Sequence, residues 1–300
     1  MRLAITGATG FVGTRLVALA LETGHTVNAL TRRPRSGGGG VNWVFGSLES
    51  ANALTSLMRG ADAVIHVAGV VTAPDRDGFV AGNIDGTRNV LVAAEAARVR
   101  RVVHVSSLAA REPALSSYGW SKCAAEGLVI GSLTDWDIVR PPAIYGPGDL
   151  DQLDLFRMAK LGVALLPPGG QMSAIHVDDL ARLLLALAGR EADRTIYEPD
   201  DTRPGGWSHA EFALAIGDAV GKRVRPIALP RRILELGAKA DALFRGRGAK
   251  LTSDRVSYFC HPDWVSDPLR RPPSELWRPR IATPAGLAET AAWYRAQALL

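Results

Sequence analysis

The chain has 300 residues, of which 47% are hydrophobic and 22% charged, as in ordinary soluble globular proteins. Its two cysteines exclude a disulfide framework and fit a reducing compartment. No basic segment followed by a long apolar stretch opens the chain, and the apolar run 180–188 is too short to span a bilayer. We therefore expect a cytoplasmic protein without a signal peptide, folded as one large or two small domains.

Short apolar segments alternate with helical patterns through the first half of the chain. The expected strands cover residues 2–6, 26–31, 41–45, 63–69, 101–107 and 136–142. The expected helices cover residues 14–22, 49–60, 83–99 and 118–130. Apolar strands separated by helices predict an α/β fold, with a doubly wound parallel sheet covered on both faces.

The second half is less regular and richer in proline and basic residues. Residues 175–188 read as a strand entering a helix, with Asp178 and Asp179 capping the helix start. We expect no metal site there, because no second His, Cys or Asp cluster has ligand spacing. A late strand is expected at 195–199, and most of 200–281 is expected to form a smaller cap over the carboxyl end of the sheet.

Positive charge is concentrated late in the chain. The net charge is +5, while residues 222–280 contain fourteen Lys and Arg but six Asp and Glu, a surplus of +8. This surplus could attract an anionic substrate, a phospholipid surface or nucleic acid. We expect no nucleic-acid partner, because no nucleic-acid motif accompanies the charge.

Residues 229–246 read as an amphipathic helix within this basic region. One side carries Ile233, Leu236 and Ala240, with Leu243 or Phe244. Such a helix could lie on a membrane surface. Because an apolar stripe more commonly packs on its own protein, we expect it to face the core.

A glycine-rich turn follows the first strand. The segment TGATGFVG, from Thr6 to Gly13, opens the first helix. Gly7 permits a tight turn, Gly10 lets the backbone approach a pyrophosphate, and Gly13 lets helix and strand pack closely. This strand–turn–helix context predicts dinucleotide binding.

The residues at the end of the second strand indicate which dinucleotide the protein binds. NAD-binding proteins usually carry an acidic residue there, which holds the ribose hydroxyls. This chain instead reads Leu30-Thr31-Arg32-Arg33. Because an Arg fork suits a 2′-phosphate, we expect NADP(H) rather than NAD(H), bound through Arg32 and secondarily Arg33.

Taken together, the motifs resemble the extended branch of the short-chain dehydrogenase/reductase superfamily, with a dihydroflavonol-reductase-like C-terminal segment. They are TGATGFVG, HVAG at 66–69, NIDGTRNVL at 83–91, VSS at 105–107, YGWSK at 118–122, RPPAIYGPGD at 140–149 and HVDDLA at 176–181. The resemblance implies a Rossmann domain from residues 1–150 and about 175–199. It implies a substrate-binding cap from about 151–174 and 200–281, followed by a C-terminal helix at 282–300.

The resemblance also implies a catalytic triad. Ser107 would hydrogen-bond the substrate carbonyl, Tyr118 would exchange its proton, and Lys122 would bind the nicotinamide ribose and lower the pKa of Tyr118. Asn83 matches a family residue that supports a proton relay, although bonding to backbone in a kinked helix is an equal alternative. Ser106 is expected to be structural.

Further cofactor contacts are implied by position. Ser47 departs from the acidic residue that relatives place near the adenine, and Tyr145 would face the substrate or fill the core. The expected cofactor-binding residues are Gly7, Thr9, Gly10, Phe11, Val12, Arg32, Arg33, Ser47, Leu48, Ala68, Gly69, Tyr118, Lys122, Pro141, Ala143 and Ile144.

These features favour one chemistry within the superfamily. Leu108 and Ala109 follow Ser107 where dehydratases carry an Asp-Glu pair, and the loop to Tyr118 is short. We expect an NADPH-dependent oxidoreductase acting on the carbonyl or alcohol of an apolar or amphipathic small molecule. The alternatives are a nucleotide-sugar epimerase and a structural NADPH-binding subunit of an assembly or membrane complex. A homodimer through helices 83–99 and 118–131 is also open.

Overall fold

The computed structural model describes residues 1–246 and 252–300, and over these ranges the chain forms two compact units. The first unit consists of Met1–Pro141, Leu180–Glu198 and Pro272–Arg278. The second unit consists of Pro142–Asp179, Pro199–Arg271 and Pro279–Leu300.

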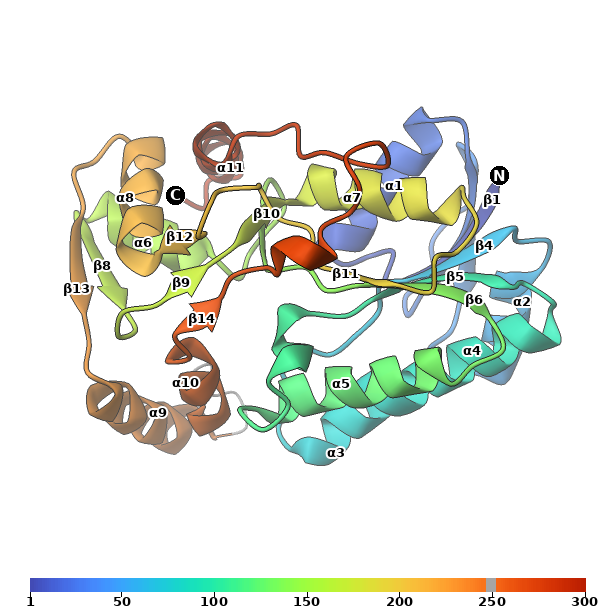
Figure 1. Ribbon diagram of the computed structural model, residues 1–300, viewed down its shortest axis with the longest axis horizontal. Coiled ribbons are helices and arrows are strands. Elements are labelled where there is room, and N and C mark those ends of the chain that lie inside the picture. The colour runs from blue at the N-terminus through green and yellow to red at the C-terminus, as the bar shows by residue number, and fades with distance from the viewer. Residues whose placement is uncertain (247–251) are drawn as a thin grey trace. The chain divides into compact units, whose positions relative to one another are not determined.

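The first unit is built on one parallel sheet (Figure 1). Within the described residues it has seven strands in the order β11-β6-β5-β4-β1-β2-β3, so the expected parallel sheet is confirmed. The central strands are buried along their length because helices cover both faces. The strands are β1 (Arg2–Thr6), β2 (Thr26–Thr31), β3 (Val41–Phe45), β4 (Ala63–His66), β5 (Arg101–Val105), β6 (Asp135–Val139) and β11 (Ile196–Tyr197).

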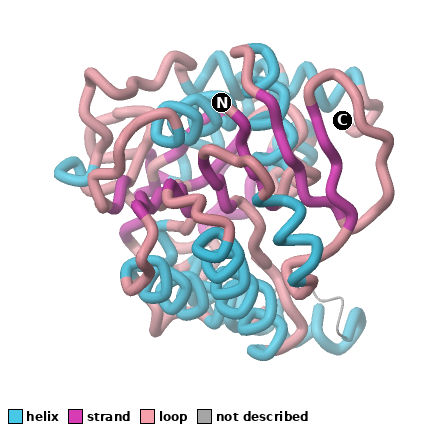
Figure 2. The backbone as a smooth tube through the Cα atoms, turned by 90° about the vertical axis from the view of Figure 1, so that its right-hand side faces the viewer, coloured by secondary structure: helices cyan, strands magenta, loops and turns pink. Residues whose placement is uncertain are grey.

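Helices lie on both sides of this sheet. One side carries α2, α4 and α5 and the other carries α1 and α7, so that in the turned view the strands lie between helical layers (Figures 1 and 2). This arrangement confirms the doubly wound α/β fold. The helices are α1 (Phe11–Glu22), α2 (Ala51–Met58), α3 (Arg76–Phe79), α4 (Gly86–Ala96), α5 (Ser117–Ile130) and α7 (Val177–Ala188), whose first three residues belong to the second unit.

The helix expected over residues 83–99 is interrupted near its start. Residues Val80–Asp85 form a wide π-helical turn, η1, and the regular helix α4 begins only at Gly86. Within η1, the side chain of Asn83 accepts a hydrogen bond from Val70 N at 2.7 Å and donates to Val70 O at 2.9 Å. A long-range side-chain contact of this kind leaves no mark in the helical periodicity.

The second unit combines short strands with helices. Strand β7 pairs with β10 rather than with the main sheet, and therefore residues 142–150 group with this unit. Other short strands form the pairings β12-β9-β14 and β13-β8. The elements are β7 (Ala143–Tyr145), α6 (Leu153–Lys160), β8 (Val163–Leu166), β9 (Gln171–Met172), β10 (Ala174–His176), β12 (Trp207–Ser208), α8 (His209–Val220), β13 (Arg225–Ala228), α9 (Arg231–Arg245), α10 (Ser253–Phe259), β14 (Asp263–Trp264), η4 (Pro268–Arg270) and α11 (Thr283–Ala296).

Aromatic side chains fill the core of the second unit. Tyr145 is fully buried, and its ring lies edge-on to Phe212 at a centroid distance of 6.4 Å. Phe156 and Tyr294 pack in the same way at 5.0 Å. Of the two roles considered for Tyr145, the structure supports the one in the core.

Helix α9 departs from its expected packing. The amphipathic pattern is present, but Ile233, Leu236, Leu243 and Phe244 are all exposed. The expectation that this stripe faces the core is therefore wrong. None of the described helices has the length and apolar character needed to cross a membrane.

A side chain would be accommodated at only some of the glycines in the turn after β1. Gly7 has a φ of +70°, and a Cβ there would lie 2.6 Å from Ala68 N. A Cβ on Gly13 would lie 2.0 Å from Gly7 O, so helix α1 packs against the turn only because Gly13 has no side chain. At Gly10 the nearest atom to such a Cβ is Gly7 O at 3.4 Å, which the fold tolerates.

Gly13→Ala should therefore lower the free energy of unfolding by about 1–3 kcal/mol, the usual cost of overpacking. Gly10→Ala should change it by less than about 0.5 kcal/mol, since its Cβ meets little. Urea unfolding of both variants without added ligand measures the difference. Equal losses of stability would contradict this account of the turn.

Candidate active site

The turn between β1 and α1 can receive an anionic group. Gly10 occupies the N-cap of α1 and has no side chain with which to cap the helix. Its backbone N–H donates to Gly7 O at 3.0 Å, and its C=O accepts from Thr14 N at 2.9 Å. The free N–H groups of the first helical turn therefore lie beside an unobstructed glycine. This geometry fits the pyrophosphate of a dinucleotide. Thr9 is exposed and Phe11 and Val12 are half-buried at the same end of the helix.

A directed chain of hydrogen bonds supports the turn from behind. Thr6 Oγ1 accepts from Ala68 N at 3.2 Å and lies 2.6 Å from His66 Nδ1. Thr87 Oγ1 donates to Asn83 O at 2.6 Å, so it accepts from His66 Nε2, 3.1 Å away. Because the ring is neutral at its lowered pKa, the proton on Nε2 leaves Nδ1 to accept from the Thr6 hydroxyl. Burial, assisted by the charge of Lys122, lowers the pKa of His66 to about 3.

Ser107 and Tyr118 meet after the end of β5. Ser107 begins the short 3-10 helix η2 (Leu108–Arg111), and its hydroxyl accepts from Ala109 N at 3.2 Å. Tyr118 lies in the first turn of α5, which Ser116 caps by accepting from Gly119 N at 2.9 Å. The Tyr118 phenol lies near enough to the Ser107 side chain for the interaction between them to lower its pKa. The structure thus brings these two expected side chains together.

The pKa of Tyr118 moves in the direction opposite to our expectation. Burial raises it above its usual value, and the interaction with Ser107 only partly offsets this effect. We expected Lys122 to lower it. The ammonium of Lys122 instead donates to Val105 O at 2.7 Å, and desolvation of the phenol dominates. Tyr118 is consequently protonated at neutral pH.

Lys122 follows Tyr118 by one helical turn and is buried. Burial lowers its pKa to about 8, although the nearby Glu126 carboxylate opposes the shift. A Cβ on Gly69 would lie 3.6 Å from Lys122 Nζ and 3.1 Å from Asn83 Oδ1. The segment after β4 and helix α5 therefore meet at a residue without a side chain.

Asn83 bonds to backbone, which is one of the two roles considered for it. Besides its two bonds to Val70, its Nδ2 donates to Ser121 Oγ at 2.8 Å. Ser121 in turn donates to Tyr118 O at 2.8 Å. Asn83 thus ties the segment after Gly69 to the helix that carries Tyr118 and Lys122.

A buried ladder of charges lies next to Ser107, and the sequence analysis did not find it. Ser106 donates to Glu126 at 2.5 Å, a contact that fits the structural role expected for it. Arg140 joins Glu126, at 2.6 Å, to the fully buried Glu198, at 3.3 Å. Arg111 contacts the other oxygen of Glu198 at 3.3 Å.

The only sequence signal of this ladder was Arg140 at the head of the RPPAIYGPGD motif. Because positive and negative charges alternate, these ion pairs connect β6, β11, α5 and the loop after Ser107.

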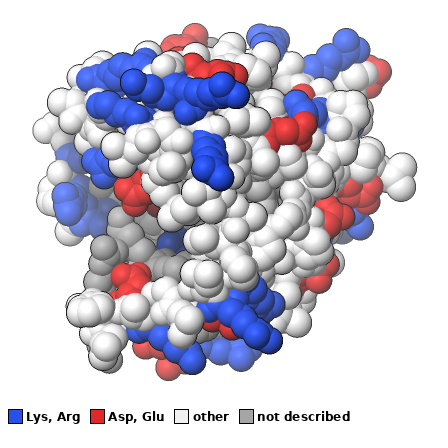
Figure 3. Space-filling model, turned by 90° about the vertical axis from the view of Figure 1, so that its left-hand side faces the viewer, with Lys and Arg blue, Asp and Glu red and all other residues white. Residues whose placement is uncertain are grey.

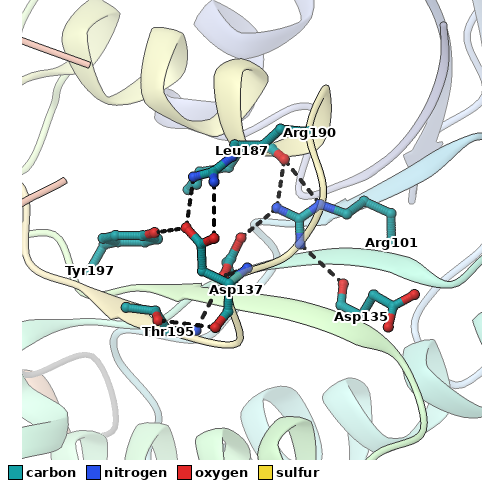
Figure 4. A network of polar contacts seen from close by, with 8 residues as sticks. Arg101, Asp135, Asp137, Leu187, Arg190, Thr195 and Tyr197 are labelled. Atoms are coloured by element: carbon teal, nitrogen blue, oxygen red, sulfur yellow. Dashed lines mark hydrogen bonds and ion pairs between the residues drawn. The ribbon is translucent and has the colours of Figure 1, made fainter. Parts of the chain in front are cut away.

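A second charged cluster lies at the opposite end of the strands (Figure 4). Arg101, the first residue of β5, contacts Asp137 at 2.5 Å and donates to Leu187 O and Asp135 O. Burial raises the pKa of Asp137 even though Arg101 opposes the shift. The cluster is remote from Ser107 along β5, so it belongs to the scaffold.

Arg32 and Arg33 follow β2 with exposed side chains. Thr31 Oγ1 donates to Arg33 O at 2.8 Å and curls this segment. Neither guanidinium forms a salt bridge with a residue that the structure describes, so both remain open to an anion. Ser47 accepts from Glu49 N at 3.3 Å, and Leu48 packs over Gly86, where a Cβ would lie 2.7 Å from Leu48 Cδ1.

The remaining expected contacts divide between the units. Pro141 ends the first stretch of the first unit, and its carbonyl accepts from Leu108 N at 3.1 Å. Ala143 and Ile144 lie in β7 of the second unit, where Ile144 O accepts from Gln152 Nε2 at 2.8 Å.

Comparisons with known proteins agree with this architecture. Residues 7–190 match a family model described as NAD(P)H-binding. The ceramide reductase of Caulobacter vibrioides is 37% identical over 302 residues, covering 98% of this chain and 94% of that protein. A 4-hydroxy-2-methyl-3-oxo-4-farnesyl-3,4-dihydroquinoline-1-oxide ketoreductase of Stigmatella aurantiaca is 31% identical over 234 residues, covering 68% of this chain and 69% of that protein.

The chain also has the same fold as known structures. The structure of MoeE5 in complex with UDP-glucose and NAD has a TM-score of 0.76 and 23% sequence identity, covering 99% of each chain. The sheet, the glycine turn, the family model and the reductase relatives agree with one another. The chain belongs to the extended short-chain dehydrogenase/reductase family and is an NAD(P)-dependent oxidoreductase.

Proposed function

We propose that the protein reduces a ketone on an amphipathic, long-chain molecule with NADPH, using Ser107, Tyr118 and Lys122. One observation carries the proposal most directly. Tyr118 is protonated, lies beside Ser107 and precedes the ammonium of Lys122 by one helical turn.

The roles follow from the chemistry of each group. When bound, NADPH would supply the hydride that the carbonyl carbon needs. Ser107 hydrogen-bonds the carbonyl oxygen, and Tyr118 donates its proton to that oxygen, so the product is an alcohol. Lys122 holds the nicotinamide ribose through its ammonium group. The raised pKa of Tyr118 supports the reductive direction, because the proton donor is fully protonated at neutral pH.

The names of two relatives support the substrate class. A ceramide and a farnesyl-bearing quinoline both join a long hydrocarbon to a polar head. Hydride and proton addition interconverts a ketone and a secondary alcohol. The substrate we propose is therefore a ceramide-like lipid that carries a ketone in place of one hydroxyl group.

NADPH is preferred over NADH in this proposal because of the charge at the end of β2. Arg32 and Arg33 are exposed there, and no acidic residue follows β2 to hold a ribose diol. The planar guanidinium group binds a 2′-phosphate through paired hydrogen bonds.

NADPH oxidation should be measured with a keto-ceramide, a short methyl ketone and UDP-glucose. We expect the long-chain ketone to have the highest kcat/KM. Tyr118→Phe and Ser107→Ala should each lower turnover at least about a hundredfold, the scale of general acid catalysis. Ser106→Ala is the matched control, since the adjacent hydroxyl bonds only Glu126 among the described residues. It should lower stability but leave turnover of the folded enzyme within a factor of a few.

Two outcomes would contradict the proposal. Conversion of UDP-glucose to its epimer, without consumption of added NADPH, would identify an epimerase. Full activity of Tyr118→Phe on the long-chain ketone would assign the proton to another group.

Arg32→Ala should weaken NADPH binding selectively by about 1.5–3 kcal/mol, the scale of a charged hydrogen bond. NADH affinity should stay unchanged, since NADH lacks the 2′-phosphate. Arg35→Ala removes the same charge from a side chain that lies over the Trp43 ring at 4.9 Å, and it serves as the control. Fluorescence titration measures both cofactors. Tighter binding of NADH than NADPH by the unmodified protein would refute the assignment.

The pH dependence of kcat/KM should show an alkaline limb near the pKa of Lys122, which burial lowers to about 8. Below that pH the side chain carries the charge that its role requires, and above it the charge is lost. Tyr118 should produce no limb near neutrality, because its pKa is raised. If kcat/KM does not fall above pH 8, the charge of Lys122 is dispensable for the reaction.

A further inference from the structure

Helix α9 exposes its most apolar side. Ala238 is its buried contact, with 2% of its surface exposed, and the adjoining positions Glu235 and Asp241 are half-buried. The opposite side carries Ile233, Leu236, Ala240, Leu243 and Phe244, which we name the α9 face. Within it, Leu236, Leu243 and Phe244 are 65%, 82% and 85% exposed.

An amphipathic helix that stabilises its own domain turns its apolar side toward the core, whereas α9 turns its apolar side outward. Helix α6 of the same unit shows the usual arrangement, with Leu153, Phe156 and Ala159 buried. Nearby apolar side chains of the second unit are also exposed, among them Ile227 on β13 and Phe259 on α10. No described segment of the second unit therefore covers the α9 face.

The sequence that contains α9 is strongly positive. Residues 222–260 contain ten Lys and Arg but three Asp and Glu, so this segment alone carries +7. Arg232 and Lys239 are exposed and share the flank of the helix next to Leu236 and Leu243. In Figure 3, basic side chains border uncharged surface along the lower part of the face that carries α9.

We propose that the α9 face docks on the surface of an anionic phospholipid bilayer. An exposed apolar stripe flanked by basic side chains enters the boundary between head groups and acyl chains, and the basic side chains pair with lipid phosphates. The charge complementarity selects a bilayer over a neutral apolar partner. This inference is independent of the proposed reaction.

Vesicle flotation of the full chain tests the proposal. Phosphatidylcholine vesicles with phosphatidylglycerol should bind the protein at least about tenfold more strongly than phosphatidylcholine alone, and added salt should weaken binding. The double variant Leu243→Asp/Phe244→Asp should lose at least about tenfold in binding. Leu133→Asp, at a residue of the first unit that is 80% exposed, is the matched control and should bind as the unmodified protein does.

Further variants test the role of the basic side chains, and unfolding measurements test whether each variant is folded. Arg232→Glu/Lys239→Glu should remove the preference for the anionic vesicles. Thermal unfolding and NADPH titration should be unchanged in every variant, because the altered side chains are exposed. Absence of vesicle binding, or equal loss in Leu133→Asp, would overturn the proposal. Self-association that is abolished by the double variant, without vesicle binding, would assign the α9 face to a second copy of the chain instead.

Discussion

The ammonium group of Lys122 is held inside the first unit, and a buried cation restricts every group packed around it. Its hydrogen bond to Val105 O and the nearby Glu126 carboxylate offset part of the cost of burial. The same charge adds to the effect of burial, which keeps the two neighbouring histidines neutral. It contributes to the lowered pKa of His66 and to that of His104, which lies beside His66 with a ring separation of 5.2 Å.

A neutral His66 is what makes the hydrogen-bond chain behind the glycine turn directional. Its Nδ1 accepts from Thr6 and its Nε2 donates to Thr87. A protonated ring would present two donors, and Thr6, already accepting from Ala68 N, could then no longer donate to it. The hydrogen bonds behind the glycine turn and the charge of Lys122 on α5 therefore belong to one buried network.

The sheet was predictable because buried strands at 2–6 and 101–105 appear as short apolar runs. The roles of Ser107, Tyr118 and Lys122 were implied instead by the resemblance that the VSS and YGWSK motifs carry. The wide turn at Val80–Asp85 depends on the contact between Asn83 and Val70, which periodicity does not reveal. Periodicity likewise identified the apolar side of α9, but it carries no information on whether that side faces the protein or the solvent.

The ladder around Ser107 also has a consequence for biosynthesis. Arg111 and Arg140 both need Glu198, which lies far along the chain, and the last segment of the first unit is Pro272–Arg278. During translation the loop carrying Ser107 leaves the ribosome well before its counter-charge has been made. The salt bridges from Arg111 and Arg140 to Glu198, which hold the loop after Ser107, can therefore close only after residue 198 has been synthesised.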